Sequence, residues 1–287
     1  MIALPSSDFS APVPMSPYDL TNLAALKAWL GLPAAPSASD ATLAALVTAA
    51  SRAILAALSR PGLLPQDYAE LCDGDRRALT LRHWPVLQVR SVTWNGAAVP
   101  QLAAGGVTAA FGYMLWPGDL APPGAPQALD LFGVQPTHRR ANVVVDYQAG
   151  YAVVGETQAI PAAAPPTLAA LAPYGPWASD LGVTYAESAG PLAAVTGAPE
   201  AGQYAVADGV YSFAAADAGA SVSLSYGYVP QDLAQAALEL AAERFRAADH
   251  IGVRSKSLGG QETIAFDSAP ISAPVLALLQ PYRRVAV

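Results

Sequence analysis

Positive charge is missing from a long part of this sequence. No lysine or arginine occurs from Tyr151 to Glu243, and up to Pro230 that stretch still carries six acidic residues. Since the formal net charge is −7, the remainder of the chain is nearly neutral, with 16 acidic against 15 basic residues. The sequence therefore predicts two bodies of different composition. The six acidic residues are Glu156, Asp180, Glu187, Glu200, Asp208 and Asp217.

Cysteine is almost absent, because Cys72 is the only one in 287 residues. A single thiol excludes an internal disulfide and a thiolate metal cage. No apolar run of membrane-spanning length lacks Pro, Gly or charge, and residues 1–20 have no basic region before an apolar stretch, so we expect neither a membrane protein nor a secreted one. With 53% hydrophobic residues the chain can still bury a large core.

Lysine is also rare, with Lys27 and Lys256 against 13 arginines. Arginine suits forked pairing with carboxylates at fixed contacts, so the composition argues against a sequence-reading nucleic-acid binder. Three arginine pairs stand out, and two interpretations stay open for each: contact with phosphates, or charge that faces solvent or a partner. They are Arg76-Arg77, Arg139-Arg140 and Arg283-Arg284.

Catalytic motifs are absent as well. The histidines, His83, His138 and His250, fall in no motif, and no Gly-x-Ser-x-Gly elbow or phosphate-binding loop occurs. We interpret Cys72 as a small buried side chain at a hairpin, and Asp73-Gly74-Asp75 as a turn, because the other ligands of a calcium loop are lacking. The sequence predicts no enzyme, and no catalytic, cofactor or metal site.

Helical spacing marks four segments. After an extended, proline-rich arm over residues 1–17, Thr21 is expected to cap a short helix that ends at Gly31. Ser39 or Asp40 is expected to cap a longer one with a single apolar stripe. A third helix is predicted from Gln231 to about Asp249, apolar on more than one side and hence buried, and a last short one over residues 274–279.

Alternating patterns predict short antiparallel strands between the second and third helices. Asp73-Gly74-Asp75 is expected to form a hairpin turn, and Asn95-Gly96 is the strongest two-residue hairpin signal. A Pro- and Ala-rich linker is expected after Tyr151, followed by a compact β-sandwich or barrel-like module. The expected strands lie at residues 68–72, 78–81, 89–94, 113–116, 129–132, 142–147, 182–185, 192–195, 203–206, 210–213 and 222–226.

The two ends of the charge-depleted segment resemble each other, Val145 to Tyr151 reading VDYQAGY and Leu224 to Tyr228 reading LSYGY. We infer an insertion that is entered and left at neighbouring points. The predicted fold class is therefore α+β: a small α-helical bundle with a β-hairpin subdomain, plus an inserted all-β, sandwich-like domain. The expected domains are the arm, a core of residues 18–151 and 228–287, and the inserted domain of residues 152–227.

Several motifs in this order resemble the head-tail connector (adaptor, or head completion) proteins of tailed bacteriophages and gene transfer agents. The C-terminal blocks carry the likeness most clearly: RFRAADHIGVRSKSLGGQETIAFD from Arg244 to Asp267, and LLQPYRRV from Leu278 to Val285. Val143-Val144-Val145-Asp146-Tyr147 and Val229-Pro230-Gln231-Asp232-Leu233 add to it. The inserted stretch, with its runs AGQY, GVYSF and AADAG, resembles a small β module found in phage virion proteins.

This resemblance implies a structural virion protein at the neck of the particle, assembled in the host cytoplasm. It implies a homo-oligomeric ring, usually of twelve copies, that lies beneath the portal protein and offers a platform to a stopper or tail completion protein. Double-stranded DNA would pass through the ring without sequence-specific binding, so a weak attraction for phosphates is what a conduit requires. No cofactor and no membrane contact are implied.

Position and composition select candidate interface residues toward the portal or a neighbouring subunit. They are Arg244, Arg246, Arg254, Lys256, Leu278, Tyr282, Arg283 and Arg284.

An alternative function makes the inserted module a binding domain for a host-surface glycan or protein. It needs an exposed aromatic platform, whereas the simpler interpretation places the same aromatic residues in the core of the module. The candidates are Tyr174, Trp177, Tyr204 and Tyr211.

Overall fold

The chain forms a helical unit and a β unit in the computed structural model. The structure describes residues 18–102, 111–116, 127–135, 140–248, 255–258, 262–265 and 270–284, with backbone only for 255–258 and 262–265. Contacts group Met1–Pro61 with Gln231–Arg283 as the helical unit, and Gly62–Pro230 with Arg284–Val287 as the β unit. The expected arm, residues 1–17, lies outside the described residues. The predicted boundaries of an adaptor core and an inserted domain stay a prediction.

Two helices open the helical unit, α1 (Leu23–Leu30) and α2 (Asp40–Leu58). The cap expected at Thr21 is wrong by one residue: the Asn22 side chain accepts a hydrogen bond from the backbone N–H of Ala25 at 2.8 Å. Asparagine at this position satisfies one of the N–H groups that a helix start leaves unpaired. Gly31 ends α1 in the left-handed conformation, as the sequence predicts.

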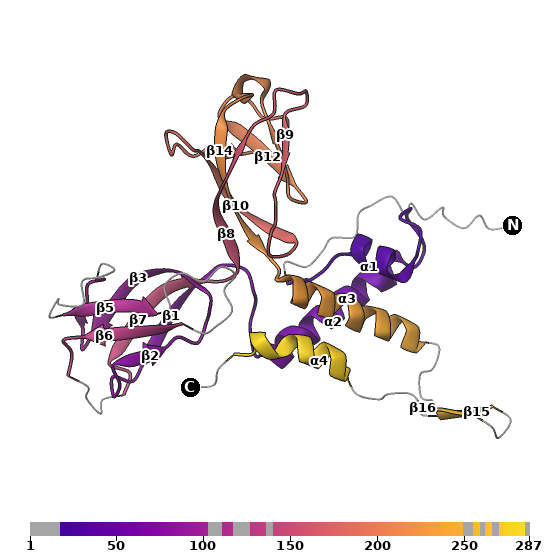
Figure 1. The fold of residues 1–287 in the computed structure, drawn as a ribbon, viewed down its shortest axis with the longest axis horizontal. Coiled ribbons are helices and arrows are strands. Elements are labelled where there is room, and N and C mark those ends of the chain that lie inside the picture. Colours follow the sequence, from indigo (N-terminus) through magenta and orange to yellow (C-terminus); the bar gives the residue numbers. More distant parts are fainter. Residues whose placement is uncertain are drawn as a thin grey trace, which may run out of the picture. The chain divides into compact units, whose positions relative to one another are not determined.

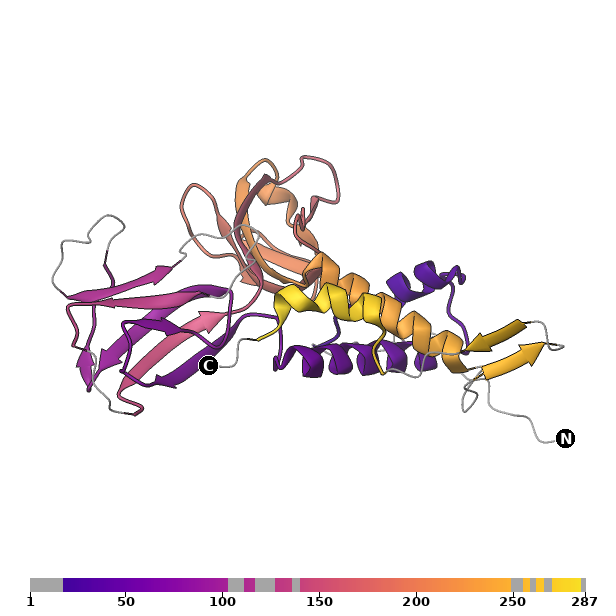
Figure 2. The same cartoon turned by 60° about the horizontal axis from the view of Figure 1, so that its bottom comes forward.

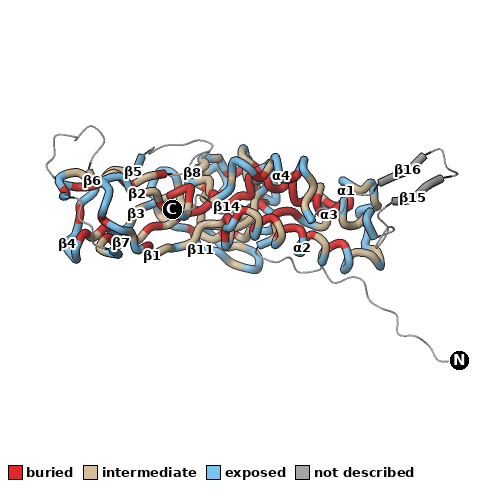
Figure 3. Tube along the Cα trace, turned by 90° about the horizontal axis from the view of Figure 1, so that it is seen from below, coloured by how far each residue is buried: buried red, intermediate tan, exposed pale blue. Residues whose placement is uncertain are grey.

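The apolar stripe of α2 forms the base of the helical unit. Leu43, Val47, Ala50, Ile54 and Leu58 are buried at helical spacing, as predicted, and α2 packs against α3 (Gln231–Ala247). Along both helices buried and exposed stretches alternate (Figure 3). These two helices come from opposite ends of the sequence, so the unit closes only after the β unit has been traversed.

Helix α3 lies at the centre of its unit, because it contacts α1, α2 and α4 (Ala273–Leu279). Leu233, Ala237 and Leu240 are buried on it, and so are alanines on its other sides. Its burial on more than one side is confirmed. Helix α4 runs alongside α3 (Figures 1 and 2) and continues into the one-turn η3 (Gln280–Tyr282). Between α3 and α4, β15 (Ser255–Leu258) and β16 (Glu262–Ala265) form an antiparallel hairpin.

The first body of the β unit packs two sheets around one core. One sheet has the order β1-β7-β3-β4 and the other β2-β6-β5. The core between them includes Leu81, Leu129, Val145 and Tyr147, each 1% exposed or less. The strands are β1 (Gln66–Cys72), β2 (Ala78–Thr80), β3 (Val86–Trp94), β4 (Ala97–Ala98), β5 (Gly112–Trp116), β6 (Ala128–Phe132) and β7 (Val143–Ala149).

The Asn95-Gly96 hairpin is confirmed, since Thr93 and Trp94 pair with Ala98 and Ala97 across it. The hairpin expected at Asp73-Gly74-Asp75 is wrong. The turn is there, but β1 pairs with β7 and β2 pairs with β6, so the chain crosses from one sheet to the other at this point. Local turn chemistry does not reveal that the next strand joins another sheet.

The second body of the β unit is again a pair of sheets, with orders β10-β14-β8 and β11-β12-β13-β9 (Figure 1). Its core is separate from that of the first body and includes Tyr204, Tyr211, Val222, Leu224 and Tyr226. The strands are β8 (Ala152–Ala159), β9 (Thr167–Ala169), β10 (Trp177–Tyr185), β11 (Ala193–Ala194), β12 (Gln203–Ala207), β13 (Val210–Phe213) and β14 (Ser221–Tyr228).

Strand β8 replaces the linker expected after Tyr151, and that expectation is wrong. Gly155 has a positive φ of 80°, and the β8–β14 register shifts between Leu224 and Tyr226. A glycine in this conformation interrupts the alternation by which a strand is read from sequence. Because β8 pairs with β14, the chain enters and leaves this body on adjacent strands.

Aromatic rings join the two β bodies. Tyr151 N–H donates to the carbonyl of Leu63 at 2.8 Å, and Tyr228 N–H donates to the carbonyl of Tyr151 at 3.2 Å. The ring of Tyr151 packs edge-on against Trp84 and Tyr228, with centroids 6.4 and 5.8 Å apart. Tyr151 and Tyr228 are each 1% exposed, so this joint is part of the packed interior. The mixed α+β fold class is confirmed.

Candidate functional site

The candidate interface residues are spread over the second half of the helical unit. Arg244 and Arg246 lie in the last turn of α3, Arg244 half-buried and Arg246 exposed. Leu278 is half-buried on α4, and Arg283 is exposed directly after η3. Arg254 lies outside the described residues, Lys256 lies on β15 with only its backbone described, and Arg284 is grouped with the β unit.

Hydrogen bonds hold both the side chain and the backbone of Tyr282. Its hydroxyl donates to Asp232 Oδ2 at 2.9 Å, and its carbonyl oxygen accepts from Arg60 Nε at 2.9 Å. Arg60 is only 8% exposed, so its guanidinium fixes the backbone of η3 from inside the helical unit. The structure thus makes Tyr282 an anchor rather than a free contact residue.

A second contact holds the start of the same segment, because Ser272 Oγ donates to Glu243 Oε1 of α3 at 2.8 Å. Residues 272–283 are therefore fixed to α3 at one end and to Arg60 and Asp232 at the other. Sequence reasoning did not select Arg60 or Asp232, since each looked like an ordinary helix boundary residue. Only their closeness to the C-terminal segment in the fold gives them this role.

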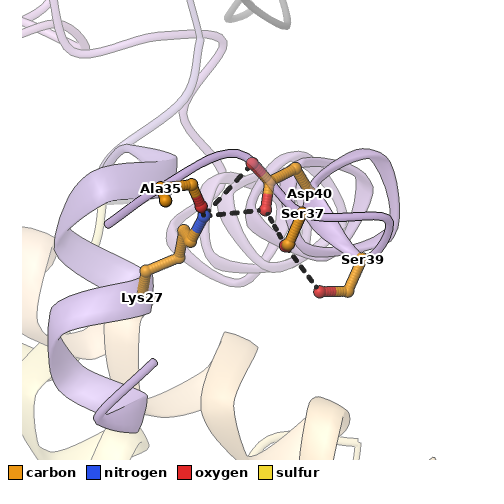
Figure 4. Close-up of polar contacts among 5 residues, drawn as sticks. All are labelled: Lys27, Ala35, Ser37, Ser39 and Asp40. Carbon is orange, nitrogen blue, oxygen red and sulfur yellow. Dashed lines mark hydrogen bonds and ion pairs between the residues drawn. The ribbon is translucent and has the colours of Figure 1, made fainter. Parts of the chain in front are cut away.

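A buried ion pair stabilises the other end of the helical unit. Lys27 is 3% exposed, and its Nζ donates to the carbonyl of Ala35 at 2.6 Å and to Asp40 Oδ1 at 2.9 Å (Figure 4). Hydrogen bonding from Ser37 and then from Lys27 lowers the pKa of the Asp40 carboxyl. Of the two expected caps, Ser39 and Asp40, Ser39 lies at the N-cap position of α2 but makes no capping hydrogen bond with its side chain. The cluster holds the loop between α1 and α2 and is structural.

Of the residues considered for nucleophilic chemistry, Cys72 and His83 lie in the described part of the chain, whereas His138 and His250 lie outside it. Cys72 lies beside a groove of about 610 Å³ between β1 and β2, and burial followed by the Glu70 charge raises the pKa of its thiol to about 11. The thiol therefore stays protonated at neutral pH, whereas the thiolate is the nucleophile. His83 stacks flat on Tyr68 with ring centroids 3.8 Å apart.

The carboxylate of Glu70, which is buried, is paired with its neighbours. Its Oε2 accepts from the Tyr147 hydroxyl at 2.7 Å and from the Arg82 backbone N–H at 3.1 Å, and its Oε1 lies 3.3 Å from Arg82 Nε. Burial raises the pKa of the Tyr147 hydroxyl, and the hydrogen bond to Glu70 adds to the effect. This arrangement gives the buried carboxylate of Glu70 the partners that it needs within the first β body.

The remaining metal-like motif is a structural turn. Asp73 Oδ1 accepts from the backbone N–H of Ala141 at 2.8 Å, which is a loop contact within the fold. Within the described ranges, no three or more His, Cys, Asp and Glu side chains come together in a way that could hold a metal ion.

Two of the four residues considered for an exposed aromatic platform are buried: Tyr204 is 2% exposed and Tyr211 is 0% exposed. Tyr174 packs against Tyr228 with ring centroids 5.7 Å apart, and Trp177 donates from Nε1 to the Tyr211 hydroxyl at 3.1 Å. For Tyr204 and Tyr211 the core interpretation is confirmed.

Among the helices of the described residues, one, α2, is long and apolar enough by length and composition to cross a membrane. A core helix of a soluble protein passes the same test, and the stripe of α2 is buried against α3. Length and composition alone therefore do not distinguish a membrane-spanning helix from a core helix.

No protein-family model matches the chain, and no curated protein matches it either.

Proposed function

We propose that this protein is a structural head-tail connector that forms a ring beneath the portal of a phage-like particle. The observation that carries the proposal is the anchored C-terminal segment of residues 272–283. Its sequence includes LLQPYR of the family resemblance, and Arg60 and Asp232 hold it in a fixed conformation that leaves Arg283 exposed. A pre-ordered segment loses little conformational entropy when it docks.

The helical unit supports the same proposal. Both ends of the chain build it, with α3 packed against three other helices and Arg244 and Arg246 at its basic end. In this proposal Arg244, Arg246 and Arg283 contact the portal or a neighbouring subunit, and Tyr282 positions Arg283. Residues 152–227 are then an inserted domain that adds to the outside of the ring or to subunit contacts.

The charge distribution suits a conduit for DNA. Each phosphate that a protein neutralises strengthens binding, so a duplex would be retarded by a strongly basic channel. This chain has a net charge of −7 and no lysine or arginine from Tyr151 to Glu243. It fits a protein that surrounds DNA without gripping it.

The experiment combines the purified full chain with the portal protein encoded in the same genome. Light scattering gives the mass of the complex and negative-stain imaging its shape. A ring that forms on the portal, or a ring of the chain alone, supports the proposal. A chain that stays monomeric and ignores the portal overturns it.

A charge-reversal variant locates the contact. Arg283→Glu is expected to weaken binding to the portal by about tenfold or more, because it places a negative charge at a basic docking position. The matched control is Arg90→Glu. Arg90 is also exposed but lies on β3, and this variant is expected to bind the portal like the wild type. Equal binding by both variants would remove Arg283 from the interface.

A further inference from the structure

One end of the first β body carries three exposed arginines on loops that are tied together. Asn142 ties them: its Oδ1 accepts from Gly74 N–H at 2.7 Å, and its Nδ2 donates to Asn95 Oδ1 at 3.2 Å. The contact between Asp73 and the Ala141 N–H adds a second link between the same loops. We call this the arginine end, defined by Arg76, Arg77 and Arg140.

The arginine end combines an ordered backbone with accessible side chains. The Arg76 side chain is 77% exposed, and its ion pair with Asp75 is long, at 3.9 Å. The Arg77 carbonyl accepts from Leu131 N–H at 2.8 Å, so its backbone is fixed to β6 while its side chain stays exposed. The Arg76-Arg77 pair and Arg140, which lie far apart in the sequence, thus contribute to one end of the first β body.

One end of the second β body carries two exposed glutamates on turns that are tied together. We call this the acidic end, defined by Glu187 and Glu200. Asp217 ties two turns together: Oδ1 accepts from the Tyr185 hydroxyl at 2.8 Å and Oδ2 accepts from Gly202 N–H at 3.0 Å. Glu187 follows Tyr185 and Glu200 precedes Gly202, and both are exposed. Since no lysine or arginine occurs in this body, the two glutamates have no basic partner within it.

We propose that the arginine end of one copy of this chain binds the acidic end of the second β body of another copy. Arginine forks match carboxylates, and the charge-depleted body is the part of the chain with an uncompensated excess of them. Asp73 and Asp75 among the arginines disfavour a phosphate backbone, which would be repelled by them, and suit a protein surface of mixed charge. The contact rests on the proposed ring function.

Such a contact joins two different surfaces, and each copy of the chain carries both an arginine end and an acidic end. Contacts of this head-to-tail type generate a closed ring when the rotation between copies closes. The charge-depleted body would then contribute to subunit contacts rather than only decorate the exterior. Its acidic character acquires a function, because it selects the arginine end over other surfaces.

The test reverses the charges on each side separately and then together. Sedimentation velocity of the full chain, up to about 1 mM protein at low salt, measures association. Arg76→Glu/Arg77→Glu is expected to weaken association by about tenfold or more, and so is Glu187→Arg/Glu200→Arg. An equimolar mixture of the two variants is expected to recover association, because the reversed arginine end meets the reversed acidic end. Asp208→Arg, on the turn between β12 and β13, is the matched control and is expected to behave as wild type.

Three results would overturn the inference. These are a wild type that stays monomeric up to about 1 mM, charge-reversed variants that associate like wild type, and a mixture that does not recover. None of them decides the ring itself, since a ring formed on the portal by the charge-reversed variants leaves the proposed function standing. A chain that forms no ring, either alone or with the portal, removes the proposed function, even where the charge-swap result holds.

Discussion

Tyr147→Phe tests how much the hydrogen bond between Tyr147 and buried Glu70 stabilises the first β body. The substitution removes one oxygen, and with it the hydrogen bond to buried Glu70 and the acceptor for the His83 backbone N–H at 3.2 Å. The ring keeps its place in the core because phenylalanine has the same shape. The change therefore isolates a polar contribution from packing.

The expected cost is about 2 kcal/mol in the free energy of unfolding of the β unit. A hydrogen bond to a charged group contributes about 1.5–3 kcal/mol. Half-buried His83 adds little, since water can replace the lost acceptor. For units of about 150–250 residues a loss of this size lowers the melting temperature by roughly 4–8 °C.

Urea unfolding followed by tryptophan fluorescence measures the loss, because Trp94 is buried in the core of this body and Trp84 is buried in the same unit. The control is Tyr113→Phe. Tyr113 is 4% exposed, and its hydroxyl makes no hydrogen bond with the described residues, so its loss is expected to cost less than about 0.5 kcal/mol. If both variants unfold at the same urea concentration, Tyr147 does not stabilise Glu70 and the reasoning is refuted.

Three further predictions address the rest of the fold. Burial raises the pKa of Tyr204, Tyr211 and Tyr226 above the ordinary value near 10, and that of Tyr228 to about 12. Because the folded-state values are the higher ones, this contribution to stability is complete below pH of about 10 and is lost as the pH rises toward them, so tyrosinate absorbance should appear together with unfolding above pH of about 10. Gly74→Ala should cost about 1–3 kcal/mol in chemical denaturation, because an added Cβ would lie 2.5 Å from Asn142 Oδ1, and an unchanged midpoint would contradict the packing of the three loops. Arg60→Leu should speed hydrogen exchange in residues 272–283 while leaving α1 unchanged, and equal rates would show that Arg60 does not hold η3.

Elements whose signals are local could be predicted from the sequence. The Asn95-Gly96 turn requires two residues in particular conformations, and the structure forms its hairpin there. The stripe from Leu43 to Leu58 has one period along one helix, and it is buried as expected. In both cases residues that are close together in the sequence determine the local structure.

Pairing between distant segments could not be predicted in the same way. Strand β1 needs β7 as its partner, and no residue near Asp73 indicates this, so a turn between two sheets looks like a hairpin. The anchoring of Tyr282 likewise joins Arg60 to the other end of the chain. Of the candidate site, the sequence indicated the basic residues but not the side chains that hold them.

The second β body satisfies its half-buried acidic residues without any lysine or arginine. Asp180 accepts hydrogen bonds from the hydroxyls of Tyr204 and Tyr211, and Glu156 accepts from Tyr226 and from the backbone N–H of Leu171 at 3.0 Å. Neutral donors satisfy these half-buried carboxylates but leave their charge in place. An arginine in the same position would cancel that charge within the body. The use of tyrosine therefore leaves the negative charge of this body uncancelled, which is what an electrostatic contact with a basic neighbour requires.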